Sequence, residues 1–342
     1  MKTRVAINGF GRIGRNVFKV AFDRKDLEIV ALNDLTDTKM LAHLLQYDTN
    51  YGVYKHKVTS DDKHIIIDGT PIPVYAEKEP ANIPWGEHDV DIVVESTGFF
   101  VKTELAKLHL KAGAKKVVIS APAKDEEAET VVIGANESQL EGSNSDVYSN
   151  ASCTTNSLAA VMDVIEREIG VEKAMMTTIH SYTADQRLQD APHRDYRRAR
   201  AAAQNIIPTT TGAAIAVTRT VPSLKGKFDG MAIRVPTSVV SVSDVTMVLR
   251  EDTTEDELKA KLKEACAQPY YQGIIDCTED QLVSSDFIGN SYSGVIDLPL
   301  TKVVDGNLAK IVVWYDNEWG YSNRLAELVS DIGKTLKKTE KK

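Results

Sequence analysis

The segment from Val5 to about Arg24 constrains the fold most strongly. A short β-branched run, Val5–Asn8, ends at the pattern GFGRIG of residues 9–14, after which apolar residues recur at helical spacing. In such a G-x-G-x-x-G turn, Gly9 makes the tight bend, Gly11 lets the backbone approach a pyrophosphate, and Gly14 lets helix and strand pack closely. The flanking strand and helix favour a dinucleotide-binding turn over a glycine-rich turn without a ligand.

An acidic residue stands where such a turn needs one. Asp34 follows the second strand candidate, Glu28–Leu32, 20 residues after Gly14. A carboxylate there can accept hydrogen bonds from both ribose hydroxyls and repels a 2′-phosphate, while the pyrophosphate lies at the helix N-terminus. The pattern therefore predicts NAD as cofactor, in preference to NADP.

The pattern of the first half of the chain differs from that of the second. Strand candidates alternate with helix-like segments up to about residue 150, which is typical of βαβ units and a parallel sheet. Beyond that point, long strand-like runs indicate an antiparallel sheet: Ala174–His180, Gly230–Val235, Val239–Leu249 and Leu308–Tyr315. We predict an α/β fold with a Rossmann-type parallel sheet in residues 1–152, completed by a C-terminal helix at 318–342. Residues 153–317 form a second α+β domain with a mainly antiparallel sheet.

Bulk composition excludes several classes of protein. The 342 residues are enough for two domains, and the net charge of −8 argues against a general nucleic-acid binder. No apolar run is long enough to predict a membrane span, and the N-terminal residues do not resemble a secretory signal. Three cysteines without zinc-ligand spacing favour a reducing compartment, so we expect a cytoplasmic protein without a bound metal.

Cys153 lies where a nucleophile is expected. Residues 149–156 are SNASCTTN, and apolar residues then recur at helical spacing, so we expect Cys153 at or beside a helix N-terminus, with Ser152 as the candidate cap. Unpaired amides at a helix N-terminus stabilise an anion, so we expect a lowered thiol pKa and a reactive thiolate. The alternative is a buried structural cysteine, against which the polar neighbours argue.

His180 is the histidine most suited to act with this thiol. It ends the strand-like run MMTTIH, and strand ends are where functional side chains project. A cysteine–histidine pair supplies a nucleophile with a general base, or a thiolate–imidazolium ion pair. No second ligand at suitable spacing supports a metal site at this histidine.

Three segments of the second half can bind an anion. Arginine clamps an oxyanion through two hydrogen bonds, and threonine hydroxyls with backbone amides also suit phosphate. The candidates are Arg194, Arg197, Arg198 and Arg200 in HRDYRRARAAA, Thr209–Thr211 with Gly212, and Arg234 at a strand end. The alternative interpretation of the arginine-rich segment is a solvated basic helical turn without a ligand.

Taken together, INGFGRIGR, SNASCTTN, HSYTADQR, PTTTGAA, MAIRVPT and WYDNEWGYS resemble the glyceraldehyde-3-phosphate dehydrogenase family, from Lys2 to about residue 332. The resemblance implies oxidative phosphorylation of glyceraldehyde 3-phosphate to 1,3-bisphosphoglycerate with reduction of NAD, through a cysteine hemithioacetal and thioester. Cys153 would be the nucleophile and His180 the base. Relatives are homotetramers in which a neighbour's loop, here around residues 182–204, borders the cofactor site.

The resemblance also implies roles for binding residues. Those matching cofactor positions are Gly9, Phe10, Gly11, Arg12, Ile13, Asp34, Lys78, Thr97, Gly98, Ser120 and Asn317. Those matching substrate and inorganic phosphate positions are Ser152, Thr154, Thr183, Arg198, Thr211, Gly212 and Arg234.

Three positions depart from the family pattern. Ile215 stands where a lysine is usual, and this removes a cation from the predicted anion site. Ser157 replaces a second cysteine, and Ala191 replaces a leucine that is common in NAD-specific relatives. Two other functions stay open: an erythrose-4-phosphate dehydrogenase, or a non-catalytic NAD-binding protein that uses Cys153 as a thiol redox sensor.

Overall fold

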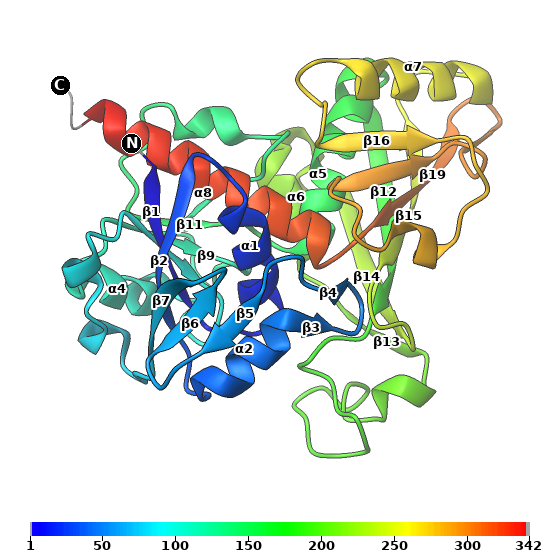
Figure 1. Ribbon diagram of the computed structural model, residues 1–342. Coiled ribbons are helices and arrows are strands. Elements are labelled where there is room, and N and C mark those ends of the chain that lie inside the picture. The colour runs from blue at the N-terminus through cyan, green and yellow to red at the C-terminus, as the bar shows by residue number, and fades with distance from the viewer. Residues whose placement is uncertain (1, 340–342) are drawn as a thin grey trace. The chain divides into compact units, whose positions relative to one another are not determined.

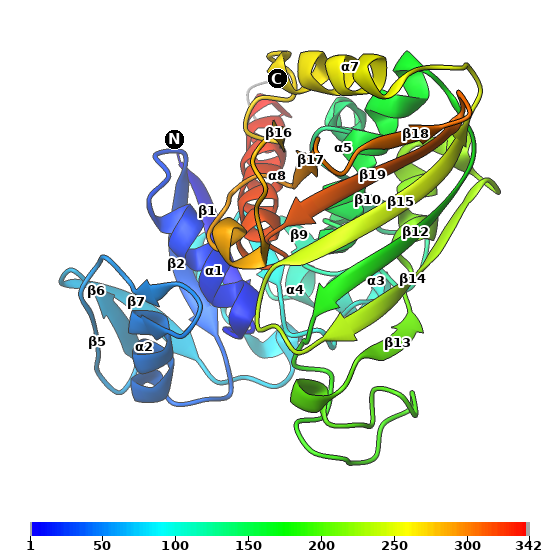
Figure 2. The same cartoon turned by 90° about the vertical axis from the view of Figure 1, so that its right-hand side faces the viewer.

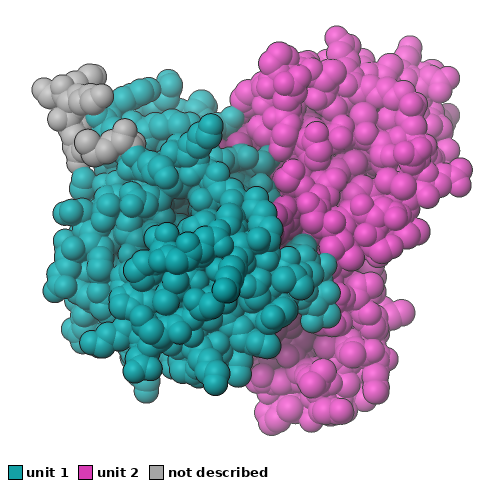
Figure 3. All heavy atoms as spheres, in the orientation of Figure 1, with its two compact units in different colours: residues 1–131, 137–151, 322–342 teal, residues 132–136, 152–321 magenta. Residues whose placement is uncertain are grey.

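The computed structural model describes residues 2–339, which form two compact units, coloured separately in Figure 3. Unit 1 contains the described residues up to 131, residues 137–151 and those from Ser322 onward. Unit 2 contains residues 132–136 and 152–321. The last three residues of the predicted closing helix, 340–342, lie outside the described residues.

Unit 1 is built on a nine-stranded sheet in the order β10-β11-β9-β8-β1-β2-β7-β6-β5 (Figure 1). Its parallel strands are β1 (Thr3–Asn8), β2 (Leu27–Asn33), β7 (Thr70–Tyr75), β8 (Ile92–Glu95), β9 (Lys116–Ile119), β10 (Glu129–Thr130) and β11 (Val147–Ser149). The predicted parallel sheet is therefore confirmed. Its central strands are mostly apolar, and all four residues of β8 are buried, as expected for a parallel sheet that is covered on both faces.

An antiparallel extension of this sheet was not predicted. Strands β5 (Val58–Ser60) and β6 (His64–Ile67) continue it beyond β7 through antiparallel pairs. The β6–β7 turn is Asp68-Gly69, with φ of 47° and 85°. Positive φ at both central residues is what a two-residue hairpin turn requires, so Asp-Gly was the available sequence signal.

The helices of unit 1 cover its sheet. They are α1 (Arg12–Phe22), α2 (Thr38–Gln46), α3 (Thr103–Ala106), α4 (Leu108–Lys111) and α8 (Trp319–Thr339), of which α8 joins this unit from Ser322. A small hairpin, β3 (Tyr47–Asp48) with β4 (Gly52–Val53), and the 3-10 turns η1 (Pro80–Asn82), η2 (Trp85–His88) and η3 (Glu137–Leu140) complete the unit. Trp85 is fully buried in a core with Ala6, Ala31 and Val93.

Unit 2 contains an eight-stranded sheet in the order β13-β14-β12-β15-β19-β17-β16, with β18 beside β19. Most of its pairs are antiparallel, as predicted, while β12 with β14 and β16 with β17 are parallel. The strands are β12 (Val171–Ser181), β13 (Ile207–Thr210), β14 (Phe228–Val235), β15 (Ser241–Leu249), β16 (Ile275–Thr278), β17 (Gly294–Asp297), β18 (Lys302–Val304) and β19 (Leu308–Tyr315).

Three helices pack on this sheet: α5 (Cys153–Glu168), α6 (Ala213–Thr220) and α7 (Glu255–Ala267). Helix α7 starts at a capping box between Thr254 and Glu257. The 3-10 turns η4 (Ala202–Gln204), η5 (Pro222–Leu224) and η6 (Ser284–Phe287) lie in the connections.

The other face of this sheet, turned towards the viewer in Figure 2, is more exposed. Residues along β15 alternate between buried and partly exposed. An open groove of about 760 Å³ lies here, lined by Met175, Phe228, Met247 and Leu308 together with Ile215 of α6. Within residues 2–339, no helix combines the length and the apolar character needed to cross a membrane.

Candidate functional site

The carboxyl ends of the parallel strands in unit 1 bring several predicted cofactor residues to one edge. Strands β9, β8, β1 and β2 are consecutive neighbours in the sheet. The one or two residues after each strand include Ser120, Thr97, Gly9 and Asp34. Ligands of open parallel sheets bind outside these ends, so the placement suits a nucleotide. Lys78, beyond the end of β7, is exposed.

The glycine turn has the geometry that the sequence predicted. Gly9 has a φ of 89°, and a Cβ there would lie 2.7 Å from the Thr97 nitrogen. A Cβ on Gly14 would lie 2.1 Å from the Gly9 oxygen, whereas one on Gly11 would have no atom within 4 Å. Gly9 and Gly14 are thus required by the fold itself, and Gly11 leaves open space at the start of α1 where a pyrophosphate can approach the backbone.

Asp34 is held in place by backbone amides. Its Oδ2 accepts from the Phe10 amide at 2.8 Å, and its Oδ1 accepts from the Thr36 amide at 2.9 Å. The Phe10 ring is buried, so this residue contributes to the turn through its backbone and not through its side chain. Arg12 donates to Asp48 at 2.9 Å, and Ile13 follows it in the first turn of α1.

Sequence reasoning missed the buried carboxylate that organises this edge. Glu95, at the end of β8, accepts from the amide and hydroxyl of Thr97 through Oε1. Its Oε2 accepts from Asn8 Nδ2 at 2.6 Å and lies 3.0 Å from His109 Nε2. The Trp85 indole donates to His109 Nδ1, which leaves Nε2 as the protonated nitrogen facing Glu95. The signal was a lone charged residue ending an otherwise apolar strand.

In unit 2, Cys153 is the first residue of α5. Ser152 caps the helix as predicted, because its hydroxyl accepts from the Thr155 amide at 3.0 Å. The preceding Ala151 has a φ of 54°, in the left-handed region that non-glycine residues rarely adopt. The Thr154 amide donates to the Cys153 sulfur.

The structure brings His180 to this sulfur. Nε2 lies 3.4 Å from Cys153 Sγ, and Nδ1 lies 2.7 Å from the Ser181 carbonyl oxygen. That carbonyl can only accept, whereas Arg234 Nη1, at 2.9 Å from the same Nδ1, can only donate. In the tautomer that donates from Nδ1 to the carbonyl, Nε2 is free to accept from the thiol. Arg234 stands opposite His180 in the β12–β14 register, and its guanidinium donates to the same carbonyl at 3.0 Å.

Burial and the nearby cation set the protonation of the pair. Burial lowers the pKa of His180 to about 3, and the positive charge of Arg234 acts in the same direction. Burial also raises the pKa of the Cys153 thiol, although Arg234 and the Thr154 amide oppose this. The expected lowering of the thiol pKa is therefore wrong for this state, because desolvation outweighs the helix N-terminus. The geometry favours a neutral thiol beside a neutral base over an ion pair.

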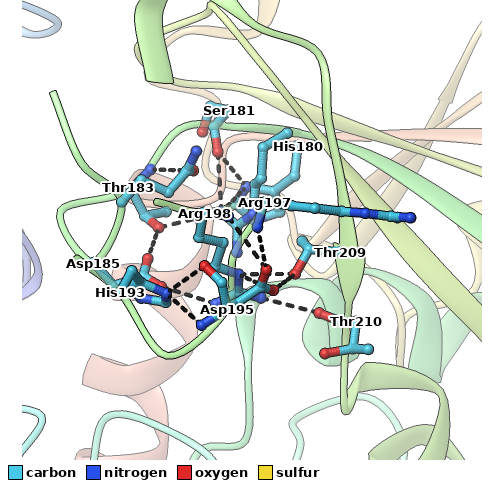
Figure 4. A network of polar contacts seen from close by, with 12 residues as sticks. His180, Ser181, Thr183, Asp185, His193, Asp195, Arg197, Arg198, Thr209 and Thr210 are labelled. Atoms are coloured by element: carbon cyan, nitrogen blue, oxygen red, sulfur yellow. Dashed lines mark hydrogen bonds and ion pairs between the residues drawn. The ribbon is translucent and has the colours of Figure 1, made fainter. Parts of the chain in front are cut away.

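Figure 4 shows the polar network that holds the predicted phosphate residues. Arg198 donates to Thr209 Oγ1 at 2.9 Å, to the Thr210 carbonyl at 3.0 Å and to Asp185 at 2.8 Å. Thr183 donates to the same Asp185 and lies 3.3 Å from the Arg234 guanidinium. Thr183, Arg198 and Arg234 therefore belong to one connected cluster, which includes an aspartate that sequence reasoning missed.

Other predicted phosphate residues take different positions. The Thr154 hydroxyl is buried against Tyr315 OH at 2.8 Å, and the Thr154 amide donates to the Cys153 sulfur. Thr211 Oγ1 accepts from the Ala213 amide at 3.1 Å, beside Gly212 at the start of α6. Arg200 pairs instead with Asp190 at 2.7 Å.

Asn317 is oriented by two hydroxyls that the sequence did not reveal. Its Oδ1 lies 3.0 Å from both Ser181 Oγ and Ser241 Oγ. Ser241 Oγ already accepts from the Ser181 amide, so its own proton points to Asn317. This fixes the side-chain oxygen inward and leaves the amide nitrogen as a donor.

Comparison with known proteins agrees with this arrangement. Residues 152–317 match the family described as glyceraldehyde 3-phosphate dehydrogenase, C-terminal domain, and residues 3–103 match its NAD binding domain. The chain is 52% identical over 334 residues to glyceraldehyde-3-phosphate dehydrogenase 1 of Bacillus subtilis, covering 98% of this chain and 99% of that protein. Identity is also 52% to the enzyme of Geobacillus stearothermophilus, over 97% and 98% of the two chains. The chain belongs to the glyceraldehyde-3-phosphate dehydrogenase family.

Proposed function

We propose that this protein oxidises glyceraldehyde 3-phosphate to 1,3-bisphosphoglycerate in the presence of inorganic phosphate, with NAD as the electron acceptor. The observation that carries the proposal is the Cys153–His180 contact of 3.4 Å at a helix N-terminus, within a unit that also holds Arg198 and Arg234. Residues 1–152 with the closing helix bind NAD, and residues 153–317 carry the chemistry.

The catalytic residues act through a thioester. His180 Nε2 takes the thiol proton as Cys153 Sγ adds to the aldehyde carbon, and the amide of Cys153 stabilises the oxyanion that forms. His180 returns this proton to the oxyanion, which gives the hydroxyl of the hemithioacetal, and takes it up again as the carbon is oxidised. NAD, when bound, supplies the hydride acceptor. Phosphate attacks the resulting thioester, displaces the Cys153 thiolate and forms the acyl phosphate.

Binding roles follow from the placement of the remaining residues. NAD is held at the edge formed by Gly9, Phe10, Gly11, Arg12, Ile13, Asp34, Lys78, Thr97, Gly98 and Ser120, while Asn317 donates to the nicotinamide amide. The two phosphate groups are held by Ser152, Thr154, Thr183, Arg198, Thr211, Gly212 and Arg234. The Gly11 opening and the Asp34 carboxylate fit NAD, and paired arginines fit a phosphate dianion.

We further propose a homotetramer in the cytoplasm. The exposed apolar residues on the open face of the unit 2 sheet, Met175, Met231 and Leu308, support packing against a second copy. Ile215 contributes to the same surface, so its apolar side chain fits an interface. Leu188 and Tyr196 are exposed on the loop around residues 182–204, which we expect to border a neighbour's cofactor site. Three free thiols suit a reducing compartment.

The test is NADH formation from glyceraldehyde 3-phosphate, with and without phosphate, then with NADP. Cys153→Ser should lower turnover by roughly a thousandfold or more while NAD binding survives. Cys277→Ser, which changes a thiol on β16, is the matched control and should keep activity. If the protein is a non-catalytic redox sensor, the unaltered protein will show no turnover. If kcat/KM is higher for erythrose 4-phosphate than for glyceraldehyde 3-phosphate, erythrose 4-phosphate is the substrate.

A further inference from the structure

The groups proposed to bind the substrate phosphate already hold a carboxylate of the protein. Asp185 Oδ2 accepts from Arg198 at 2.8 Å, and Asp185 Oδ1 accepts from the Thr183 hydroxyl (Figure 4). These two donors are the ones a phosphate oxygen would use. In this state an internal anion therefore takes the place of the external one.

A second aspartate beside Arg198 has a different role. Asp195 accepts from the backbone amides of Arg197 and Arg198 at 2.8 and 3.3 Å, and from Thr209 Oγ1 at 2.6 Å. These bonds shape the loop, and its side chain is 29% exposed. Among residues 2–339, the Asp185 carboxylate accepts only from Thr183 and Arg198, and its side chain is 47% exposed. Asp185 can therefore leave its partners without undoing the loop.

The charges favour an exchange of anions at this site. Burial raises the pKa of Asp185, but the hydrogen bond from Thr183 and the charge of Arg198 outweigh it, so the net pKa is lowered and the group is ionised at neutral pH. Among the described residues no carboxylate pairs with Arg234, which is partly buried and 3.3 Å from Thr183. Asp195 also pairs with Arg198, at 3.6 Å from its Nε. Once the Asp185 carboxylate leaves, Arg198, Arg234 and Asp195 together keep a net positive charge, and a phosphate dianion binds such a cluster more strongly than a carboxylate does.

We propose that Asp185 is the resident anion of the substrate-phosphate site and that a phosphate monoester binds by displacing its carboxylate from Arg198 and Thr183. This inference rests on the function proposed above. Asp185 thereby sets specificity, because an aldehyde without a phosphate group cannot displace the carboxylate from Arg198. Asp185 also lowers the affinity for every ligand that does displace its carboxylate.

The experiment replaces the carboxylate by its neutral isostere in the full-length protein. Asp185→Asn can still accept from Thr183 but no longer competes for the Arg198 charge. Titration calorimetry with inorganic phosphate, in the absence of NAD and aldehyde, should show about two- to tenfold tighter binding than the unaltered protein. The KM for glyceraldehyde 3-phosphate should fall by a similar factor while kcat is retained. Asp190→Asn is the matched control, because Asp190 pairs with Arg200 at 2.7 Å on the same loop.

The opposite sign overturns the proposal. If Asp185 instead positions Arg198 for the ligand, phosphate binding to Asp185→Asn will be unchanged or weaker and the KM will stay or rise. Asp185→Ser serves as a second neutral variant, and circular dichroism with a melting curve checks that both are folded. If the unaltered protein does not turn over glyceraldehyde 3-phosphate, the proposed function fails, and the phosphate titration still reports on Asp185.

Discussion

Arg234 should tune the reactivity of Cys153 through its charge, and Arg234→Leu isolates that effect. The guanidinium lies 2.9 Å from His180 Nδ1, and His180 Nε2 lies 3.4 Å from Cys153 Sγ. A positive charge favours the thiolate, so it lowers the thiol pKa. Leucine removes the charge but keeps the pocket apolar, so the desolvation of Cys153 remains.

The size of the shift follows from these contacts. The two contacts in series put the guanidinium within roughly 9 Å of the sulfur, where a unit charge at an effective dielectric constant of about 20 changes a pKa by roughly 1 to 1.5 units. The thiol pKa of Arg234→Leu should rise by that amount. The pKa of His180 should also rise, because the same charge disfavours the imidazolium.

Alkylation by iodoacetamide measures the thiolate directly. The second-order rate constant at Cys153 should be followed against pH in phosphate-free buffer without NAD, so that neither ligand site contributes. The midpoint of the profile should move to higher pH in Arg234→Leu and remain close to that of the unaltered protein in Arg234→Lys, which keeps the charge. A midpoint that is unchanged or moves to lower pH would refute the electrostatic reasoning.

Two further predictions concern the base and the glycine turn. His180→Asn should lower kcat by about 10²- to 10⁴-fold and leave NAD affinity unchanged. Part of the lost activity should be recovered at high pH, where the thiol ionises without a base. A steady-state rate near that of the unaltered protein would exclude His180 as the base. Gly14→Ala should lower the melting temperature, because its Cβ would lie 2.1 Å from the Gly9 oxygen, whereas Gly11→Ala should leave the melting temperature unchanged and weaken NAD binding. Equal melting temperatures for both variants, or unchanged NAD affinity in Gly11→Ala, would contradict this assignment of the two glycines.

The glycine turn and the helix cap could be predicted from the sequence because the patterns that indicate them span only a few consecutive residues. The glycine turn, the strand before it and the helix after it occupy one continuous segment, and the three glycines have steric reasons that a single βα unit contains. The same holds for Ser152, which caps the helix that Cys153 begins. Helical periodicity and a capping side chain extend over only a few residues, so a linear pattern carries them.

The pairing of functional groups was decided by tertiary structure. Register between β12 and β14 places Arg234 opposite His180, although 54 residues separate them in the chain. Burial of the Cys153–His180 pair then reversed the expected direction of the thiol pKa, because desolvation depends on the whole surrounding fold. Asp185 on Arg198 and Glu95 beneath Thr97 were missed for the same reason. The sequence supplies the chemical groups and the local geometry, but their partners, solvent exposure and charge state come from contacts between residues distant in the chain.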